Sequence, residues 1–226
     1  MKRMLAMFTV LAVWVALAAP PGAAPNTLTA KEKAEGWILL FDGKTLDNWD
    51  PNTNPNGAWK VVDGTIMTDS PRGTTLLTKE DFANFELRLE FRTTDNVNSG
   101  VMLRNPRPHP APPGEAKGKK KGGGGQGYEV QIRDKDPGHY TGGSYLTASL
   151  VNVQKAPADA KIRNGEWNTF DITADGDHFI IIYNGKKVVD AHDSKLTNGA
   201  IGLQWAHPED APGTKIEFRN IRVKRL

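Results

Sequence analysis

Residues 127–134 read Gly-Tyr-Glu-Val-Gln-Ile-Arg-Asp, and this stretch indicates both a fold and a site. Side chains alternate between the two faces of a β-strand, so the stretch predicts one apolar and one polar face. The apolar face would hold Tyr128, Val130 and Ile132, and the polar face would hold Glu129, Gln131 and Arg133. A carboxylate, an amide and a guanidinium in a row can bind or deprotonate a polyhydroxylated substrate. A hydrogen-bond ladder on an exposed sheet explains the same row equally well.

Short β-forming runs recur along the rest of the chain. Residues 85–92 alternate apolar and charged side chains with a clear period of two. Further runs cover residues 59–62, 65–68, 100–104, 128–133, 167–172, 179–183, 187–189, 201–205 and 216–223. Asp63-Gly64 and Asn184-Gly185 are typical of two-residue hairpin turns, and a short helix is expected from Leu28 to Ala34. The chain is therefore predicted to be all-β, an antiparallel β-sandwich of the concanavalin-like jelly-roll kind.

The predicted core follows from the same alternation. It consists of Phe85, Leu87, Leu89, Val101, Leu103, Tyr128, Val130, Ile132, Leu203 and Trp205. The chain has no cysteine, so disulfides cannot stabilise it and apolar burial must do so. About 200 residues outside the N-terminal segment are enough for one domain with a sizeable core.

The N-terminal residues are typical of a secretory signal. Lys2 and Arg3 precede an apolar run from Leu5 to Leu17, and residues 16–18 offer a small-x-small cleavage pattern. The run is too short to span a membrane comfortably. We expect a signal peptide over residues 1–18, a linker over residues 19–35, one domain over residues 36–226, and a periplasmic or secreted protein.

A basic insert interrupts the strand pattern at residues 105–126. This stretch is rich in Pro, Lys and Gly, a composition that cannot build a core, and we expect a mobile loop. The formal net charge is +3, but the signal residues and this insert supply the excess of positive charge. A basic patch confined to one low-complexity loop is weak support for a nucleic-acid partner, and none is expected.

Polar candidates gather on the central strands when the period of two is applied to each. If these strands form one curved sheet, its open, concave side would carry Glu90, Arg104, Glu129, Gln131 and Gln204. Gly100 and Gly202 would leave room there for a ligand. Simpler interpretations exist, because Glu90 and Arg104 can form a cross-strand ion pair and the two glutamines can be ordinary surface amides.

Four loop residues complete the set of candidates. His207 ends the strand that carries Gln204, and Trp49 lies in the loop-like segment 47–51, where it could stack on a sugar ring. Asp134 and His139 lie in a turn-rich loop and, with Asp136, could bind a divalent cation. Their spacing matches no strict ligand pattern, and a solvated turn is the more ordinary interpretation.

Several catalytic signatures are missing from the chain. There is no serine-hydrolase elbow, no zinc-protease motif, no phosphate-binding loop and no dinucleotide fingerprint. There is also no Glu-x-Asp-x-x-Glu run, so a retaining mechanism with two carboxylates lacks its usual sequence support.

Taken together, ten motifs in order resemble the 3-keto-disaccharide hydrolase domain family, long catalogued as a domain of unknown function. They include GWILLFDGKTLDNW at 36–49, FELRLEFR at 85–92, NSGVMLR at 98–104, GYEVQIRD at 127–134 and GAIGLQ at 199–204. The resemblance covers about residues 36–226. It implies a laminin-G-like jelly roll and the cleavage of glycosides already oxidised to a ketone at C3.

The chemistry that the resemblance implies needs a base for the hydrogen on C2, positive charge near the ketone oxygen, and an acid for the leaving oxygen. Glu129 is the predicted base, with a pKa raised by a neighbouring Glu90. Arg104 is the predicted partner of the developing negative charge, and His207 is the predicted acid. The predicted substrate-binding residues are Glu90, Gln131, Gln204, Trp49, Asp134 and His139. A divalent metal could supply the positive charge instead. The alternative function is a non-catalytic, lectin-like carbohydrate-binding module.

Overall fold

The computed structural model describes residues 24–107, 127–135, 145–206 and 213–226. The expected signal peptide, most of the basic insert, His139 and His207 lie outside the described residues. None of the helices among the described residues is long and apolar enough to cross a membrane.

The described chain is built almost entirely of strands. The helical elements are α1 (Ala30–Ala34), η1 (Pro51–Thr53) and η2 (Pro55–Gly57). The strands are β1 (Ile38–Leu39), β2 (Lys60–Val62), β3 (Thr65–Thr68), β4 (Thr74–Phe82), β5 (Phe85–Thr93), β6 (Asn98–Asn105), β7 (Tyr128–Arg133), β8 (Asn168–Asp175), β9 (His178–Tyr183), β10 (Lys186–His192), β11 (Gly199–Trp205) and β12 (Ile216–Arg225).

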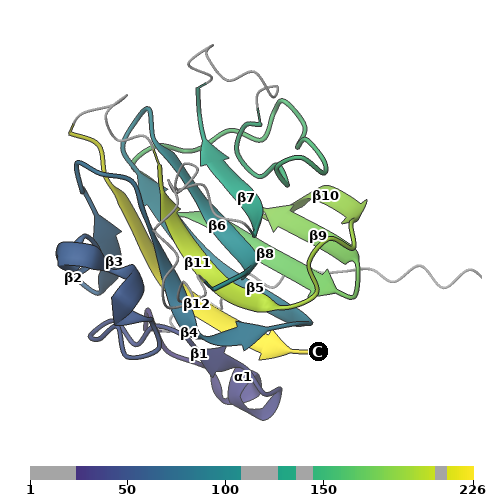
Figure 1. Cartoon of the computed structure of the whole chain (residues 1–226), viewed down its shortest axis with the longest axis horizontal. Coiled ribbons are helices and arrows are strands. Elements are labelled where there is room, and N and C mark those ends of the chain that lie inside the picture. Colours follow the sequence, from purple (N-terminus) through teal and green to yellow (C-terminus); the bar gives the residue numbers. More distant parts are fainter. Residues whose placement is uncertain (1–23, 108–126, 136–144, 207–212) are drawn as a thin grey trace, which may run out of the picture.

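The strands form two antiparallel sheets (Figure 1). The larger sheet has eight strands in the order β10-β9-β8-β5-β12-β3-β2, with β1 paired to β12. The smaller sheet has four strands in the order β4-β11-β6-β7. The predicted all-β sandwich of the jelly-roll kind is therefore confirmed.

The core lies between the two sheets, where their inner faces meet. All ten residues of the predicted core are buried there, and none of them exposes more than 5% of its surface. Phe91, Phe170 and Tyr183 stack on the inner face of the larger sheet, and Tyr128 packs on Phe179 across the gap between the sheets. The period of two therefore located the inner faces correctly on both sheets.

Local sequence chemistry accounts for the tight reversals. Asp63 and Gly64 both have positive φ between β2 and β3, as do Asn184 and Gly185 between β9 and β10. Asparagine, aspartate and glycine adopt this conformation at least cost, so both hairpin predictions are confirmed. Strand β4 was not predicted, because its sequence TTLLTKEDF has no sustained alternation.

The N-terminal residues that precede the first strand pack on the larger sheet. Thr29 and Glu32 cap α1 reciprocally, and Glu32 forms an ion pair of 2.9 Å with Arg222 of β12. Asn26 exchanges two backbone-to-side-chain hydrogen bonds with Asn220. The second half of the segment 19–35, expected as a linker, is thus held against the folded domain.

Candidate active site

The outer face of the four-stranded sheet, which points away from the core, carries the polar row that the sequence singled out. Strand β6 lies between β7 and β11, and the register places Gly100 opposite both Gln131 and Gln204. In the adjacent row, Met102 lies opposite both Glu129 and Gly202. Glu129, Gln131 and Gln204 therefore share one face, as predicted, and Gly100 is the gap at its centre.

Glu129 fills the space above Gly100. A Cβ atom added to Gly100 would lie 2.9 Å from Oε1 of Glu129 and 3.0 Å from its Cγ. The side chain thus leans from β7 across the backbone of β6. The sequence predicted that Gly100 leaves room for a ligand; the structure shows that the carboxyl group of Glu129 uses this room.

Burial dominates the acidity of Glu129. It raises the pKa of this carboxyl to about 7, while a hydrogen bond from the side chain of Gln204 and the charge of Arg133 act in the opposite direction. The expected raised pKa thus arises from desolvation and not from repulsion by Glu90. A carboxyl group that titrates near neutral pH is suited to proton transfer.

Gln204 is almost completely buried beside this carboxyl group, with 4% of its surface exposed. Its amide nitrogen lies 3.9 Å from the sulfur atom of Met102, and its amide oxygen Oε1 is buried without a hydrogen-bond partner. Buried polar atoms are normally paired, so this oxygen retains an unused capacity to accept a hydrogen bond.

Gln131 and Arg133 lie on the same face as Glu129. The side-chain oxygen of Gln131 accepts a hydrogen bond of 3.0 Å from the backbone N–H of Ile132. Arg133 is 7% exposed, and its Nε donates to the backbone oxygen of Lys135 at 2.9 Å. Arg133 was part of the opening sequence pattern but not of the predicted site, although its charge acts on Glu129.

Asp134 lies at the end of β7, where the sequence placed the rim of the site. Its Oδ2 accepts hydrogen bonds from the backbone of Asn96 and the side chain of Asn164. Its Oδ1 is buried without a partner. Two asparagines therefore tie Asp134 to the neighbouring loops.

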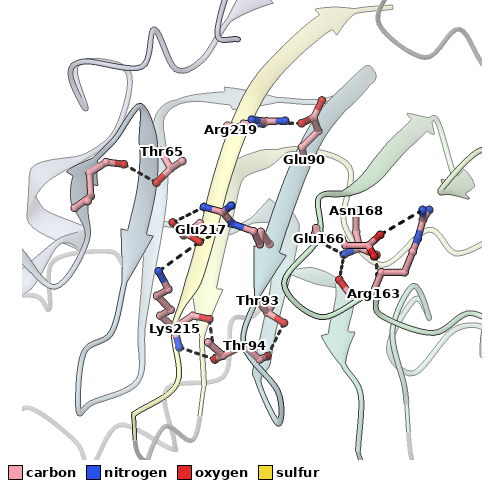
Figure 2. A network of polar contacts seen from close by, with 12 residues as sticks. Thr65, Glu90, Thr93, Thr94, Arg163, Glu166, Asn168, Lys215, Glu217 and Arg219 are labelled. Carbon is pink, nitrogen blue, oxygen red and sulfur yellow. Dashed lines mark hydrogen bonds and ion pairs between the residues drawn. The ribbon is translucent and has the colours of Figure 1, made fainter.

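Glu90 lies elsewhere, which corrects the prediction of one shared surface. It belongs to β5 of the eight-stranded sheet, and its carboxylate binds Arg219 at 2.7 Å (Figure 2). It also accepts a hydrogen bond of 2.8 Å from the amide of Asn220. The alternation assigned Glu90 correctly to an outer face, but β5 pairs with β8 and β12 rather than with β6. Glu90 forms a cross-strand ion pair, although its partner is not Arg104.

Arg104 also departs from the predicted position. It has a φ of 50°, which breaks the alternation at the end of β6, and its side chain is fully buried. The guanidinium donates to the backbone oxygens of Ala83, Gly176 and Leu196 at 2.7–2.9 Å. Its carbon atom lies 5.2 Å from the ring centroid of Phe179. Arg104 thus joins three loops inside the sandwich and does not line the outer face with Glu129.

Trp49 is buried rather than exposed, with 1% of its surface accessible. Its ring nitrogen donates to the backbone oxygen of Leu40 at 3.0 Å, and its backbone pairs with Thr78 of β4. The polar neighbours that made its segment look like a loop form the turn around it, while the ring fills the core. A sugar-stacking role for Trp49 is therefore wrong.

The two histidine candidates lie outside the described residues, so their predicted roles remain predictions. The described segments that precede His139 and His207 lie close together. Asn98 of β6 pairs with Arg133, and its backbone oxygen accepts a hydrogen bond from Ala206. Within the described ranges, no three His, Cys, Asp or Glu side chains gather as metal ligands.

Comparison with known proteins identifies the relatives of this chain. A model of the 3-keto-alpha-glucoside-1,2-lyase-like domain matches residues 36–224. In an alignment 246 residues long, gaps included, the chain is 26% identical to a 3-keto-disaccharide hydrolase of Bacteroides thetaiotaomicron. The match covers 89% of this chain and 82% of that relative.

Solved structures give the same fold. Two crystal structures from Parabacteroides distasonis, whose names class them provisionally as glycosyl hydrolases, have TM-scores of 0.70 and 0.63. They are 22% and 27% identical, cover 90% and 84% of this chain, and are themselves covered over 100% and 99% of their lengths. The lumenal domain of VIP36, bound to Ca²⁺ and Man3GlcNAc, has a TM-score of 0.57 at 11% identity; the match covers 85% of this chain and 89% of that domain. The VIP36 likeness concerns the fold alone.

Proposed function

The chain belongs to the 3-keto-alpha-glucoside-1,2-lyase-like domain family, and on that premise we propose that it cleaves glycosides that carry a ketone at C3. The reaction takes place at the outer face of the four-stranded sheet, and Glu129 is its base. The observation that carries this proposal is the half-buried Glu129, whose carboxyl group lies over Gly100 with a pKa of about 7.

The first step removes the hydrogen on C2. A ketone at C3 makes this hydrogen acidic, because the electron pair left behind is delocalised into the carbonyl group as an enediolate. The Glu129 carboxylate takes the proton and becomes a neutral carboxyl group, the form that its buried position favours. Burial thus makes Glu129 a stronger base than a solvated carboxylate.

The second step breaks the glycosidic bond. The electron pair of the enediolate forms a double bond between C1 and C2 and regenerates the ketone, while the oxygen substituent leaves C1 and takes up a proton. Addition of water across the double bond then gives net hydrolysis. The proton held by Glu129 is available for the leaving oxygen, and His207 remains the sequence-based candidate for this donation.

Arg133 takes the electrostatic role first assigned to Arg104. It lies on the strand and face of Glu129, and its charge acts on that carboxyl group. A nearly buried guanidinium stabilises developing negative charge more strongly than a solvated one, because water screens it less. We propose that Arg133 stabilises the enediolate.

A lectin-like module is the second candidate, because the VIP36 lumenal domain shares the fold and binds a mannose-containing glycan. Sugar binding requires the polar face but no base. The substrate is a carbohydrate in either case, and the N-terminal pattern of residues 1–18 supports export to the periplasm or the medium.

Turnover of a 3-keto-glucoside by the parent protein and by Glu129→Gln tests the proposal. The amide keeps the shape of the side chain but cannot take a proton, so we expect turnover to fall by at least 100-fold while sugar binding persists. Parallel reactions with EDTA test whether a divalent metal contributes. Full activity of Glu129→Gln would contradict the assignment, and binding without turnover by the parent protein would favour the lectin-like function.

A further inference from the structure

Glu129 and Gln204 interact although a strand separates them. Glu129 belongs to β7 and Gln204 to β11, and β6 runs between them. Neighbouring strands lie about 4.8 Å apart, so a side chain on β6 would normally block a contact between β7 and β11. The residue opposite Gln204 on β6 is Gly100, which has no side chain, and the carboxyl group of Glu129 occupies that position.

The two ends of the Gln204 amide differ: the nitrogen has neighbours, whereas the oxygen has no hydrogen-bond partner. Its nitrogen lies 3.9 Å from the sulfur atom of Met102, and it is close enough to Glu129 to lower the pKa of that carboxyl group. Its oxygen Oε1 is buried and accepts nothing from the described residues. Gln131, on the other side of Gly100, differs in this respect, because its side-chain oxygen already accepts the backbone N–H of Ile132.

We propose that Gln204 is a positioning residue that holds the Glu129 carboxyl group over Gly100, and that its free oxygen Oε1 accepts a hydrogen bond from the hydroxyl group on C2 of the sugar. This inference rests on the proposed function and identifies the feature of the substrate that is recognised. The C2 hydroxyl and the C2 hydrogen share one carbon atom. An amide that contacts the base with one end can therefore contact the hydroxyl with the other.

The arrangement aligns the reacting atoms. A hydroxyl bound to Oε1 fixes the rotation of the sugar about C2, so that the C2 hydrogen faces the carboxylate that the same amide holds. Proximity and orientation of this kind supply a large part of enzymatic rate enhancement. A buried acceptor left without a partner also disfavours sugars that lack the C2 hydroxyl, because they leave the acceptor unpaired.

Gln204→Met tests the positioning role, with Thr75→Val as the matched control. Methionine keeps the length of the side chain and removes both polar ends. Thr75 lies opposite Gln204 on β4, on the side away from Glu129, and valine replaces only its hydroxyl with a methyl group. We expect kcat/KM for a 3-keto-glucoside to fall 10- to 100-fold in Gln204→Met and to stay within twofold in Thr75→Val.

Two further readouts separate positioning from a structural role. The hydrogen bond from Gln204 lowers the pKa of Glu129, so its loss should shift the midpoint of the pH profile of kcat/KM upward. The melting temperature should stay equal or rise, because methionine removes an unpaired buried acceptor. An unchanged kcat/KM and an unchanged midpoint would overturn the positioning role. If Gln204→Met does not fold, Gln204→Glu should raise the midpoint further, because it places a second carboxyl group beside Glu129.

A 2-deoxy-3-keto-glucoside tests the acceptor role. The parent protein should cleave it at least tenfold more slowly than the 2-hydroxy sugar, and Gln204→Met should cleave both at similar rates. An equal preference for the 2-hydroxy sugar in both proteins would overturn the acceptor role. Turnover retained by Glu129→Gln would instead refute the proposed function, so the two failures are distinguishable.

Discussion

The outer faces of the two sheets are both polar, but they differ in how their polar groups are paired. On the eight-stranded sheet, charged residues pair with opposite charges on the neighbouring strand. Arg219 binds Glu90 at 2.7 Å (Figure 2), and Arg92 binds Glu217 at 2.8 Å. On the four-stranded sheet, Glu129 is half-buried, desolvation raises the pKa of its carboxyl group, and the side-chain oxygen of Gln204 has no hydrogen-bond partner. Paired charges stabilise a fold, whereas a carboxyl group with a raised pKa beside an unpaired acceptor remains available to a ligand.

The aromatic rings at the outer face of the larger sheet are likewise paired, in their case with cations. Trp167 on the larger sheet lies under the guanidinium groups of Arg92 and Arg219, at 4.7 and 3.8 Å from their carbon atoms. Trp37 is covered in the same way by Arg88 at 4.4 Å and Lys224 at 5.6 Å. These rings are already occupied by cations and are poorly placed to stack on a sugar. These contacts support the proposal that catalysis takes place on the smaller sheet, while the pairs on the larger sheet stabilise the fold.

Filling the gap at Gly100 should have the largest effect on activity. The methyl group of Gly100→Ala would lie within 2.9–3.3 Å of three atoms of the Glu129 side chain, which must move away. A misplaced base costs about 100-fold in kcat/KM, while stability should change little because the end of a side chain can move. Steady-state kinetics and thermal unfolding measure the two effects.

Gly202→Ala is the matched control for that variant. Gly202 lies on the same face, but its added Cβ would meet Leu77 at 2.8 Å and Met102 at 3.1 Å instead of Glu129. We expect a loss of about 1–3 kcal/mol in the free energy of unfolding and a smaller loss of activity than in Gly100→Ala. A larger loss of activity in Gly202→Ala than in Gly100→Ala would contradict the role of Gly100 in placing Glu129.

The pH dependence of catalysis should report the buried carboxyl group. A base must be deprotonated in the free enzyme, so kcat/KM should rise with pH, with a midpoint near 7, the pKa of Glu129. A midpoint near the ordinary glutamate value would show that Glu129 is solvated or is not the base. The profile of Gly100→Ala should shift toward lower pH if the displaced carboxyl group becomes more exposed to water.

The same carboxyl group should make stability depend on pH. Its folded pKa of about 7 exceeds the ordinary glutamate pKa of 4.5, so between these pH values the folded state keeps a proton that the unfolded chain has lost. The folded state is therefore favoured below pH 4.5 and loses this advantage as pH rises to 7. Glu129→Gln should match the parent protein at pH 4 and exceed its free energy of unfolding by roughly 3 kcal/mol at pH 8. Urea unfolding at both pH values measures this difference, and equal stabilities at pH 8 would contradict the buried charge.

Breaking a pair on the larger sheet should have the smallest effect on activity. Glu90→Gln removes the charge that binds Arg219 but keeps an oxygen for Asn220. The side chains of Glu90 and Arg219 are 18% and 29% exposed, so the pair should contribute only about 1 kcal/mol to stability. Turnover should remain at the parent level. A Glu90→Gln variant that folds but has lost turnover would contradict a purely stabilising role for the outer face of the larger sheet.

The sequence predicted those features that depend on local periodicity. Alternation along β5, β6, β7 and β11 identified the inner faces, and it placed Glu129 and Gln204 on an outer face. Two other candidates, Glu90 and Arg104, were predicted at the wrong place for separate reasons. Periodicity does not tell which strands pair, so Glu90 was assigned to the wrong sheet. A single residue with positive φ, Arg104, reversed the direction of a side chain that the pattern had pointed outward.

Other features depend on tertiary packing that no local pattern encodes. The polar residues around Trp49 suggested an exposed loop, but its ring enters the core and donates to Leu40. The role of Gly100 was only half predicted: the gap was expected, while its use by Glu129 depends on the register between β6 and β7. The raised pKa of Glu129 likewise follows from burial in the folded chain and not from a neighbour in sequence.

The most direct test of the account follows the hydrogen on C2 during cleavage in D₂O. If Glu129 removes the C2 hydrogen, the released sugar has lost it, either to a double bond between C1 and C2 or to deuterium from the solvent. Glu129→Gln and a reaction without enzyme should leave that hydrogen in place over the same time. A product of the parent protein that retains the original C2 hydrogen would contradict proton abstraction by Glu129.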